Sequence, residues 1–295
     1  TEVGYTNEKK DMNDLTNYIE KRLKSYGVKT VDSIDELKQF SCDFIVNCIN
    51  KDNISELSFA FAADGFAVLS ETPAYTNEAQ LKKLLMMFNP EYKLQIAEQF
   101  HLKPTYQAIK KVIESGVIGE INNIYISVAH DYHAASLIRY LLNSDKAELL
   151  FQTESNLPIF HTNFRYGEVS PKTFQLSTRV IKIFDVNGKT VIYDFDKEQY
   201  FSPIRTDNLV IRGTRGEINN QTVRYFNVND EFVESKITQH HSGKLDGLYN
   251  SHITFENKVL YSSPFGTARL SDEETAIATV LLKIKDYLKT GKEFY

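Results

Sequence analysis

The sequence predicts an α/β fold in two parts: a doubly wound parallel sheet, followed by an α+β part with a large, mostly antiparallel open sheet. Two observations lead to this prediction. Strand and helix patterns alternate at short intervals through the first 120 residues, as they do in parallel sheets covered by helices. Beyond them strand patterns dominate, and Asn187-Gly188 between two of these is typical of a two-residue hairpin. The 295 residues suffice for two domains, which we place at residues 1–120 and 121–295.

In the first part, strands are expected at residues 2–5, 43–49, 66–70 and 92–97. The helices between them begin and end at recognisable residues. Gly27 and Gly65 are placed to end helices in the left-handed conformation, and Ser33-Ile34-Asp35-Glu36 forms a capping box. Thr76 is expected to cap the next helix, and Pro104 suits the first turn of a helix that runs to residue 115.

In the second part, strands are expected at residues 121–129, 173–185, 190–195, 209–212, 222–227, 232–238, 252–255 and 259–262. A helix is expected over residues 134–142. A second capping box, Ser271-Asp272-Glu273-Glu274, begins the closing helix. His240-His241 lies beside glycines and is predicted to be a surface loop, with the lining of a substrate cleft as the alternative.

Composition and charge indicate an ordinary soluble globular protein. Hydrophobic residues make up 42% of the chain and charged residues 25%, which excludes disordered and collagen-like classes. The net charge of −5 is spread without a basic block, so neither nucleic acid nor an anionic membrane surface is the expected partner. The apolar run at residues 59–69 is interrupted by Asp64 and Gly65 and is shorter than the ~20 residues of a membrane span. A small-molecule partner is favoured.

The two cysteines, Cys42 and Cys48, bracket the strand expected at residues 43–49. We interpret them as small buried residues in a reducing compartment, which makes the cytoplasm the expected location. No Gly-x-Gly occurs anywhere in the chain, although the first strand of a dinucleotide-binding sheet is expected to lead into a Gly-rich turn. The pattern alone therefore predicts only an α/β part and a β-rich part.

Four segments, in matching order, resemble one enzyme family. Residues 43–73 combine a strand, Asn50, a helix, a second strand and Glu71-Thr72-Pro73. Residues 98–104 lead to a helix that ends in Gly116-Val117-Ile118-Gly119, and residues 208–218 and 270–295 follow. These segments resemble the glucose–fructose oxidoreductase/inositol dehydrogenase/rhizopine catabolism (Gfo/Idh/MocA) family.

The resemblance implies a Rossmann-type domain at residues 1–120 that binds NAD or NADP, and a substrate and dimerisation domain at residues 121–295. It also implies a homo-oligomer assembled through the second-domain sheet. Two departures bear on catalysis: Thr72 stands where the family has a lysine near the nicotinamide, and Ala129 stands where it has an acid. His133 falls on the family's histidine. Of the family's three polar catalytic groups, only the histidine is therefore kept in place.

His133 is a candidate base for the hydroxyl proton, because an imidazole titrates near neutral pH and needs no metal for this. The alternative is structural: His130 to His133 would cap a helix and hydrogen-bond across the domain junction. Lys103 and His101 are candidates for the missing positive charge, with solvated side chains as the alternative. A metal site at His130 and His133 is not expected, because no cysteine or carboxylate cluster completes it.

The predicted site residues fall into three sets. The catalytic set is His133 and Thr72, and the substrate-binding set is Lys103, His130 and Asp131. The cofactor-binding set is Thr6, Asn7, Cys48, Ile49, Asn50, Glu71 and Thr72.

The N-terminal residues bear on the choice of cofactor. The chain as given opens at Thr1, and we expect an earlier strand, Gly-rich turn and helix before it, or another segment in the central place of the sheet. If residues 2–5 form the second strand, Thr6 and Asn7 meet the adenosine ribose. The nearby Lys9 and Lys10 then slightly favour NADP, with a solvated basic pair as the alternative.

The sequence thus predicts a cytoplasmic NAD(P)-dependent oxidoreductase acting on a hydroxyl or carbonyl of a sugar, polyol or related small metabolite. The alternative is a family member that binds or regulates without turnover, which the replacement of the lysine and the acid favours.

Overall fold

The computed structural model describes residues 20–161, 173–200, 202, 204–241, 250–266 and 268–294. The strand expected at residues 2–5, together with Thr6 and Asn7, lies outside these ranges. A parallel sheet in the order β1-β2-β3 forms the first part, from β1 (Ile45–Asn47), β2 (Val68–Ser70) and β3 (Leu94–Ile96). Asn47 is in register with Ser70, and Ser70 with Ile96, so all three strands end at the same edge.

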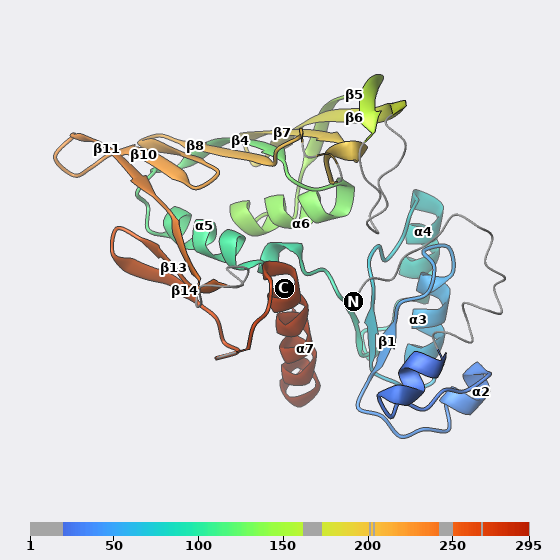
Figure 1. The fold of residues 1–295 in the computed structure, drawn as a ribbon. Coiled ribbons are helices and arrows are strands. Elements are labelled where there is room, and N and C mark those ends of the chain that lie inside the picture. The colour runs from blue at the N-terminus through green and yellow to red at the C-terminus, as the bar shows by residue number, and fades with distance from the viewer. Residues whose placement is uncertain are drawn as a thin grey trace.

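Helices cover this sheet on both faces (Figure 1). Val68 packs on α3, whereas the next residue, Leu69, packs on α7 against Ile284, because successive side chains of a strand point to opposite faces. The closing helix therefore packs on the parallel sheet, although it comes from residues 121–295. The helices are α2 (Ile34–Leu37), α3 (Ile54–Ala63), α4 (Glu78–Met87) and α7 (Asp272–Thr290).

An eight-stranded sheet forms the second part, in the order β11-β10-β9-β8-β4-β7-β6-β5. Its neighbours are antiparallel except for β4 and β7, which run parallel. Two helices, α5 (Pro104–Glu114) and α6 (Asp131–Leu142), lie along one face of this sheet (Figure 1). The strands are β4 (Ile121–Ser127), β5 (Glu148–His161), β6 (Thr173–Val186), β7 (Lys189–Asp196), β8 (Asn208–Gly213), β9 (Gly216–Asn219), β10 (Thr222–Phe226) and β11 (Phe232–Lys236).

The main core lies between these two helices and the large sheet. Its fully buried members include Ile109 of α5, Leu137 of α6 and Ile124 of β4. A small antiparallel sheet packs beside it through Ile253, in the order β12-β13-β14. Its strands are β12 (Thr238–His241), β13 (Asn250–Phe255) and β14 (Lys258–Ser262), and two 3-10 turns are η1 (Phe100–Leu102) and η2 (Lys197–Tyr200).

The predicted fold class is confirmed, including the parallel sheet with helices on both faces and the large, mostly antiparallel sheet. Local signals also hold: the Ser271 capping box forms in full, and Asn187 and Gly188 turn the β6–β7 hairpin at φ of 53° and 78°. None of the described helices is long and apolar enough to cross a membrane.

Several local predictions are wrong. Cys42 and Cys48 are exposed, because they flank a strand at the edge of the described parallel sheet and lie outside its core. Asn77 caps α4 in place of Thr76, by accepting the backbone N–H of Gln80. The pair His240-His241 ends the strand β12, since its backbone pairs with β13.

Candidate active site

The site is built where the three parallel strands end and the second part begins. Glu71 directly follows β2, and Glu98 comes two residues after β3 and two residues before η1. The N-terminal turns of α6 and α7 reach the same place, because His133 and Glu273 both contact the segment around η1. We call Glu98, Gln99, Lys103, His133 and Glu273 the junction cluster.

The central contact of the junction cluster joins His133 to Glu98. His133 Nδ1 lies 2.8 Å from Glu98 Oε2, and the two side chains are only 13% and 10% exposed. Glu98 Oε1 accepts the backbone N–H of Phe100 at 2.8 Å, and the Phe100 ring stacks on the His133 imidazole at 5.3 Å. Both partners are therefore held by further contacts in one geometry.

The partners of His133 decide which nitrogen is available for chemistry. An ionised carboxylate can only accept hydrogen bonds, so His133 Nδ1 carries the hydrogen that points to Glu98. In the neutral ring, Nε2 then carries the lone pair. Such a ring can take a proton from a hydroxyl, and the adjacent carboxylate stabilises the imidazolium that results.

The start of α6 orients a second histidine beside the first. Asp131 has φ of 28°, a left-handed value that is uncommon outside glycine, and its N–H donates to the Tyr193 hydroxyl at 3.0 Å. The Tyr200 hydroxyl accepts the backbone N–H of His130 at 2.9 Å and also lies 2.9 Å from His130 Nδ1. The ring centroids of His130 and His133 lie 5.1 Å apart and the ring planes are inclined at 70°, so the two imidazoles are in edge-to-face contact.

Lys103 does not supply an unbalanced positive charge. Its Nζ lies 2.6 Å from Glu273 Oε2, and Gln99 Nε2 donates to Glu273 Oε1 at 2.9 Å. Burial acts to raise the pKa of Glu273, but the hydrogen bonds from Lys103 and Gln99 outweigh it and hold the pKa below its usual value. Lys103 and Glu273 therefore form a charge-balanced pair next to His133.

His101 cannot supply the missing charge either. It is 4% exposed, its Nδ1 lies 3.1 Å from the Ser136 hydroxyl, and its ring packs against Tyr140. Burial lowers its pKa to about 4, although the negative charge of Glu98 acts to raise this pKa. The ring is neutral at physiological pH, so this interpretation from the sequence is wrong.

The predicted cofactor residues lie at the ends of β1 and β2. Cys48 and Ile49 follow β1 and are exposed, and the Asn50 side chain accepts the N–H of Asn53 at 3.3 Å within the turn to α3. Glu71 Oε1 accepts hydrogen bonds from the backbone N–H and the hydroxyl of Thr72, at 3.1 and 2.9 Å. The Thr72 hydroxyl is thus engaged by Glu71, and its catalytic role stays a prediction.

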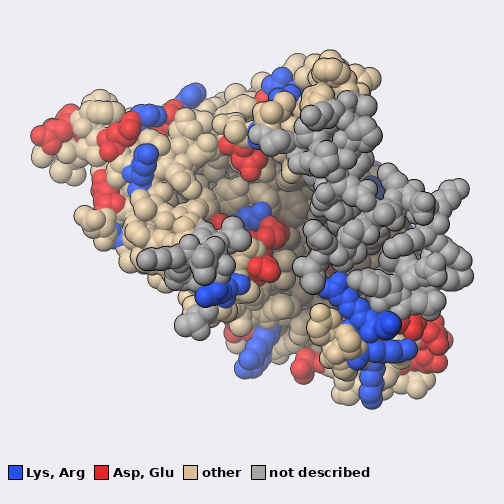
Figure 2. All heavy atoms as spheres, in the orientation of Figure 1, with Lys and Arg blue, Asp and Glu red and all other residues tan. Residues whose placement is uncertain are grey.

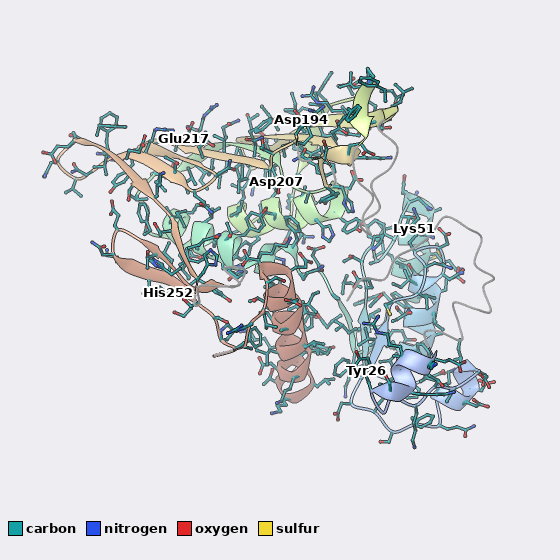
Figure 3. All side chains as sticks on the ribbon, in the orientation of Figure 1. Tyr26, Lys51, Asp194, Asp207, Glu217 and His252 are labelled. Carbon is teal, nitrogen blue, oxygen red and sulfur yellow. The ribbon has the colours of Figure 1, made fainter. Side chains whose placement is uncertain are left out.

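Two hollows lie beside the segments that carry the junction cluster, and none of the five cluster residues lines either of them. A polar hollow of about 560 Å³ is lined by Tyr106, Asn219, Arg224 and Asp207, and Tyr106 stacks on Phe100 at 5.3 Å. In Figure 3, Asp207 projects below the large sheet, and Figure 2 shows the molecular surface hollowed at this place. Asp207 is exposed as a residue, yet desolvation of its carboxylate raises its pKa. The hydrogen bond from Gln199 and the positive charge of Lys103 act in the opposite direction and are outweighed.

The second hollow, of about 330 Å³, has mostly apolar walls. It lies along α6 beside Asp131 and Tyr132, with Phe184 and Lys182 of β6 opposite, and Tyr75 from the loop after β2 also reaches it. Asp131 Oδ1 lies 3.6 Å from Lys182 Nζ. Asp131 therefore borders this hollow, while His130 faces Tyr200.

Three residues of the site were missed from the sequence: Glu98, Tyr200 and Glu273. Glu98 carried a usable signal, because it follows the strand predicted at residues 92–97, and ligand sites gather at the carboxyl ends of parallel strands. Tyr200 and Glu273 are far from His133 in sequence and carried none. Among the described residues, no group of three or more His, Cys, Asp or Glu is arranged to hold a metal ion.

Comparisons with known proteins identify the fold. No protein-family model matches the sequence, and no curated protein matches it either. An oxidoreductase from Agrobacterium radiobacter, solved with NAD+, L-tartaric acid and magnesium, is 16% identical, with a TM-score of 0.62 over 94% of this chain and 80% of that one. A levoglucosan dehydrogenase, solved with NADH and levoglucosan, is 14% identical, with a TM-score of 0.59 over 92% of this chain and 78% of that one.

An oxidoreductase from Sinorhizobium meliloti is 13% identical, with a TM-score of 0.59 over 93% of this chain and 79% of that one. At these identities the likeness shows the fold, which is that of Rossmann-type oxidoreductases with a second, sheet-bearing part. This fold agrees with the one that the resemblance to the Gfo/Idh/MocA family implies.

Proposed function

We propose that the protein is an NAD(P)-dependent oxidoreductase that oxidises a hydroxyl of a sugar, polyol or related small metabolite, or reduces the corresponding carbonyl. One observation carries the proposal: His133, oriented by the buried Glu98, lies at the edge where parallel strands end. Ligands of open α/β sheets bind at this edge, and a histidine held by a carboxylate is equipped to move the hydroxyl proton.

The residues at the strand ends fit the nicotinamide half of the cofactor. Glu71 and Asn50 present acceptors and an amide at the edge of β1 and β2, suited to ribose hydroxyls and to a carboxamide. Exposed Ile49 offers an apolar contact for a ring. The cofactor would supply the acceptor for the hydride. The slight preference for NADP rests on Lys9 and Lys10 and stays a prediction.

In this proposal His133 takes the hydroxyl proton on Nε2 during oxidation and returns it during reduction. Glu98 fixes the tautomer and stabilises the positive ring, 2.8 Å away. The paired Lys103 and Glu273 add little net charge nearby. In this proposal Glu98, which follows β3, is the carboxylate partner of His133, whereas the family has its acid at the position of Ala129.

The polar hollow favours a substrate with several hydroxyl groups. Its lining includes the amides of Asn219 and Asn220, the carboxylate of Asp207 and the guanidinium of Arg224, which offer both donors and acceptors. Its volume of about 560 Å³ is in the range of small-molecule sites. Substrate binding by Lys103, His130 and Asp131 remains part of the proposal.

A second candidate function is binding or regulation without turnover. The observation in its favour is that Thr72 replaces the family's lysine, while Lys103 is charge-paired with Glu273. A protein of this kind would bind NAD(H) or NADP(H) and leave every substrate unchanged.

The exposed apolar residues of β5 and β6 support a homo-oligomer. Leu149, Phe151, Phe174 and Leu176 are 50%, 51%, 75% and 73% exposed, and β5 is an edge strand of the large sheet. Leu149 is in register with Phe184 and Phe174 with Phe160, so these side chains are spread along the β5–β6 hairpin. Exposed apolar side chains along an edge hairpin are typical of an interface. We therefore propose that a second copy covers this surface.

The test is a nicotinamide absorbance assay on the full-length protein, with NAD+ and NADP+ against a panel of sugars and polyols. Turnover that disappears in His133→Gln supports the oxidoreductase. Cofactor binding without turnover supports the second candidate, and the absence of cofactor binding contradicts both. His241→Gln, at an exposed histidine in β12, is the matched control.

A further inference from the structure

A third cavity, of about 460 Å³, shares η1, α6 and α7 with the junction cluster but none of its residues. Residues from five elements line it, and none of those residues is an Asp or a Glu. Those used below are His101, Tyr140, Tyr261, Ser262, Lys283 and Phe294.

A lysine that pairs with no carboxylate among the described residues borders this cavity. Lys283 is partly buried in α7, and its Nζ donates to the backbone oxygen of Phe294 at 2.8 Å. Among the described residues, no carboxylate oxygen lies within 4.0 Å of this nitrogen. Desolvation lowers the pKa of Lys283. The positive charge of Lys292 lowers this pKa further, and the negative charge of Asp286 acts to raise it. Withdrawing an ammonium from water is costly unless an anion compensates it.

Several other polar groups of the cavity can donate hydrogen bonds. Burial raises the pKa of Tyr140 to about 12 and that of Tyr261 above its usual value, so both phenols keep their hydrogens. Ser262 adds a third hydroxyl, and His101 is neutral. The walls between these groups are apolar and include Leu102. A ligand with acceptor oxygens at one end and an apolar body would match this lining.

We propose that the cavity binds a small organic carboxylate. Lys283 would meet the carboxylate, the Tyr261 hydroxyl would donate to it, and the ring or chain would lie against Phe294 and Leu102. One ammonium balances one negative charge, which favours a monocarboxylate over a phosphate dianion. The cavity lies next to Tyr140 and His101, on the helix and the turn that carry His133 and Glu98, so its ligand would contact both segments that hold the proposed base.

The experiment is calorimetric titration of the full-length protein with benzoate, in the absence of nicotinamide cofactor. We expect saturable binding that Lys283→Met weakens by about tenfold or more, because the charge-assisted contact is lost. Lys285→Met is the matched control, since Lys285 is exposed on the same helix, and it should bind benzoate like the wild type. Tyr261→Phe, which removes one donor and keeps the ring, should weaken binding by a smaller factor.

Three results would overturn this inference: no benzoate binding by the wild type, equal binding by Lys283→Met, or binding of neutral benzamide as tight as that of benzoate. Inorganic phosphate serves as a second probe, and tighter binding of phosphate than of benzoate would also contradict a monocarboxylate site. The measurement uses no cofactor and no turnover. Absence of benzoate binding would therefore contradict the carboxylate site and leave the proposed oxidoreductase function untouched, and absence of turnover would leave the carboxylate site untouched.

Discussion

Replacing Glu98 by Gln removes one negative charge beside His133 and leaves the shape of the side chain almost unchanged. In the wild type the two side chains are about nine-tenths buried and their atoms lie 2.8 Å apart. A hydrogen bond to a charged group contributes about 1.5–3 kcal/mol. About 1.4 kcal/mol corresponds to tenfold in rate, so we expect kcat to fall by roughly 10- to 150-fold. The amide also permits the wrong tautomer, by donating to His133 Nδ1.

The assay measures initial rates with the best substrate and cofactor of the panel, and separates kcat from KM. Glu98→Asp keeps the charge and should recover part of the lost kcat, while the cofactor Kd of both variants stays near that of the wild type. Glu114→Gln, at an exposed carboxylate of α5, is the matched control. A Glu98→Gln enzyme with unchanged kcat, or with only KM raised, would refute the role given to Glu98.

Three further predictions concern stability and assembly. Burial holds the pKa of His101 at about 4, below its ordinary 6.5, so the unfolded chain binds the extra proton between these pH values. Stability should therefore fall as the pH drops through this window, by up to about 3 kcal/mol, and urea titrations of His101→Phe should lack this part of the decline. Ala129 is fully buried in the main core, so Ala129→Asp should lower Tm strongly in thermal scans and should not restore activity to Glu98→Gln; a stable, active double variant would contradict this. Joint replacement of Phe174 and Leu176 by Ser should convert the proposed oligomer to monomer in light scattering, and an unchanged mass would place the interface elsewhere.

Features set by neighbouring residues were predictable from the sequence. The Ser271 box needs only the spacing to Glu274, and the hairpin needs only that Asn187 and Gly188 tolerate positive φ. The strand β5 was missed because its residues are largely exposed and show no clean alternation of apolar and polar residues. Its place is fixed by a long backbone pairing with β6, which sequence patterns do not reveal.

The candidate site was predictable only in outline. His133 could be identified by resemblance, and the end of β3 could be expected to carry a polar group. The pairing of His133 with Glu98 depends on how α6 docks beside η1, 35 residues away along the chain. The same docking buries His101, whose sequence position before a helix suggested exposure.

The central claim is that a nicotinamide cofactor binds at the carboxyl edge of β1 to β3. The chain has no tryptophan, so Ile49→Trp would create a single donor for energy transfer to NADH at this edge. Val228→Trp would place the donor in the β10–β11 turn, at the opposite end of the molecule in Figure 1. We predict saturable quenching of the tryptophan at position 49 by NADH and much weaker quenching at position 228. Equal quenching at both positions, or none at position 49, would contradict the account.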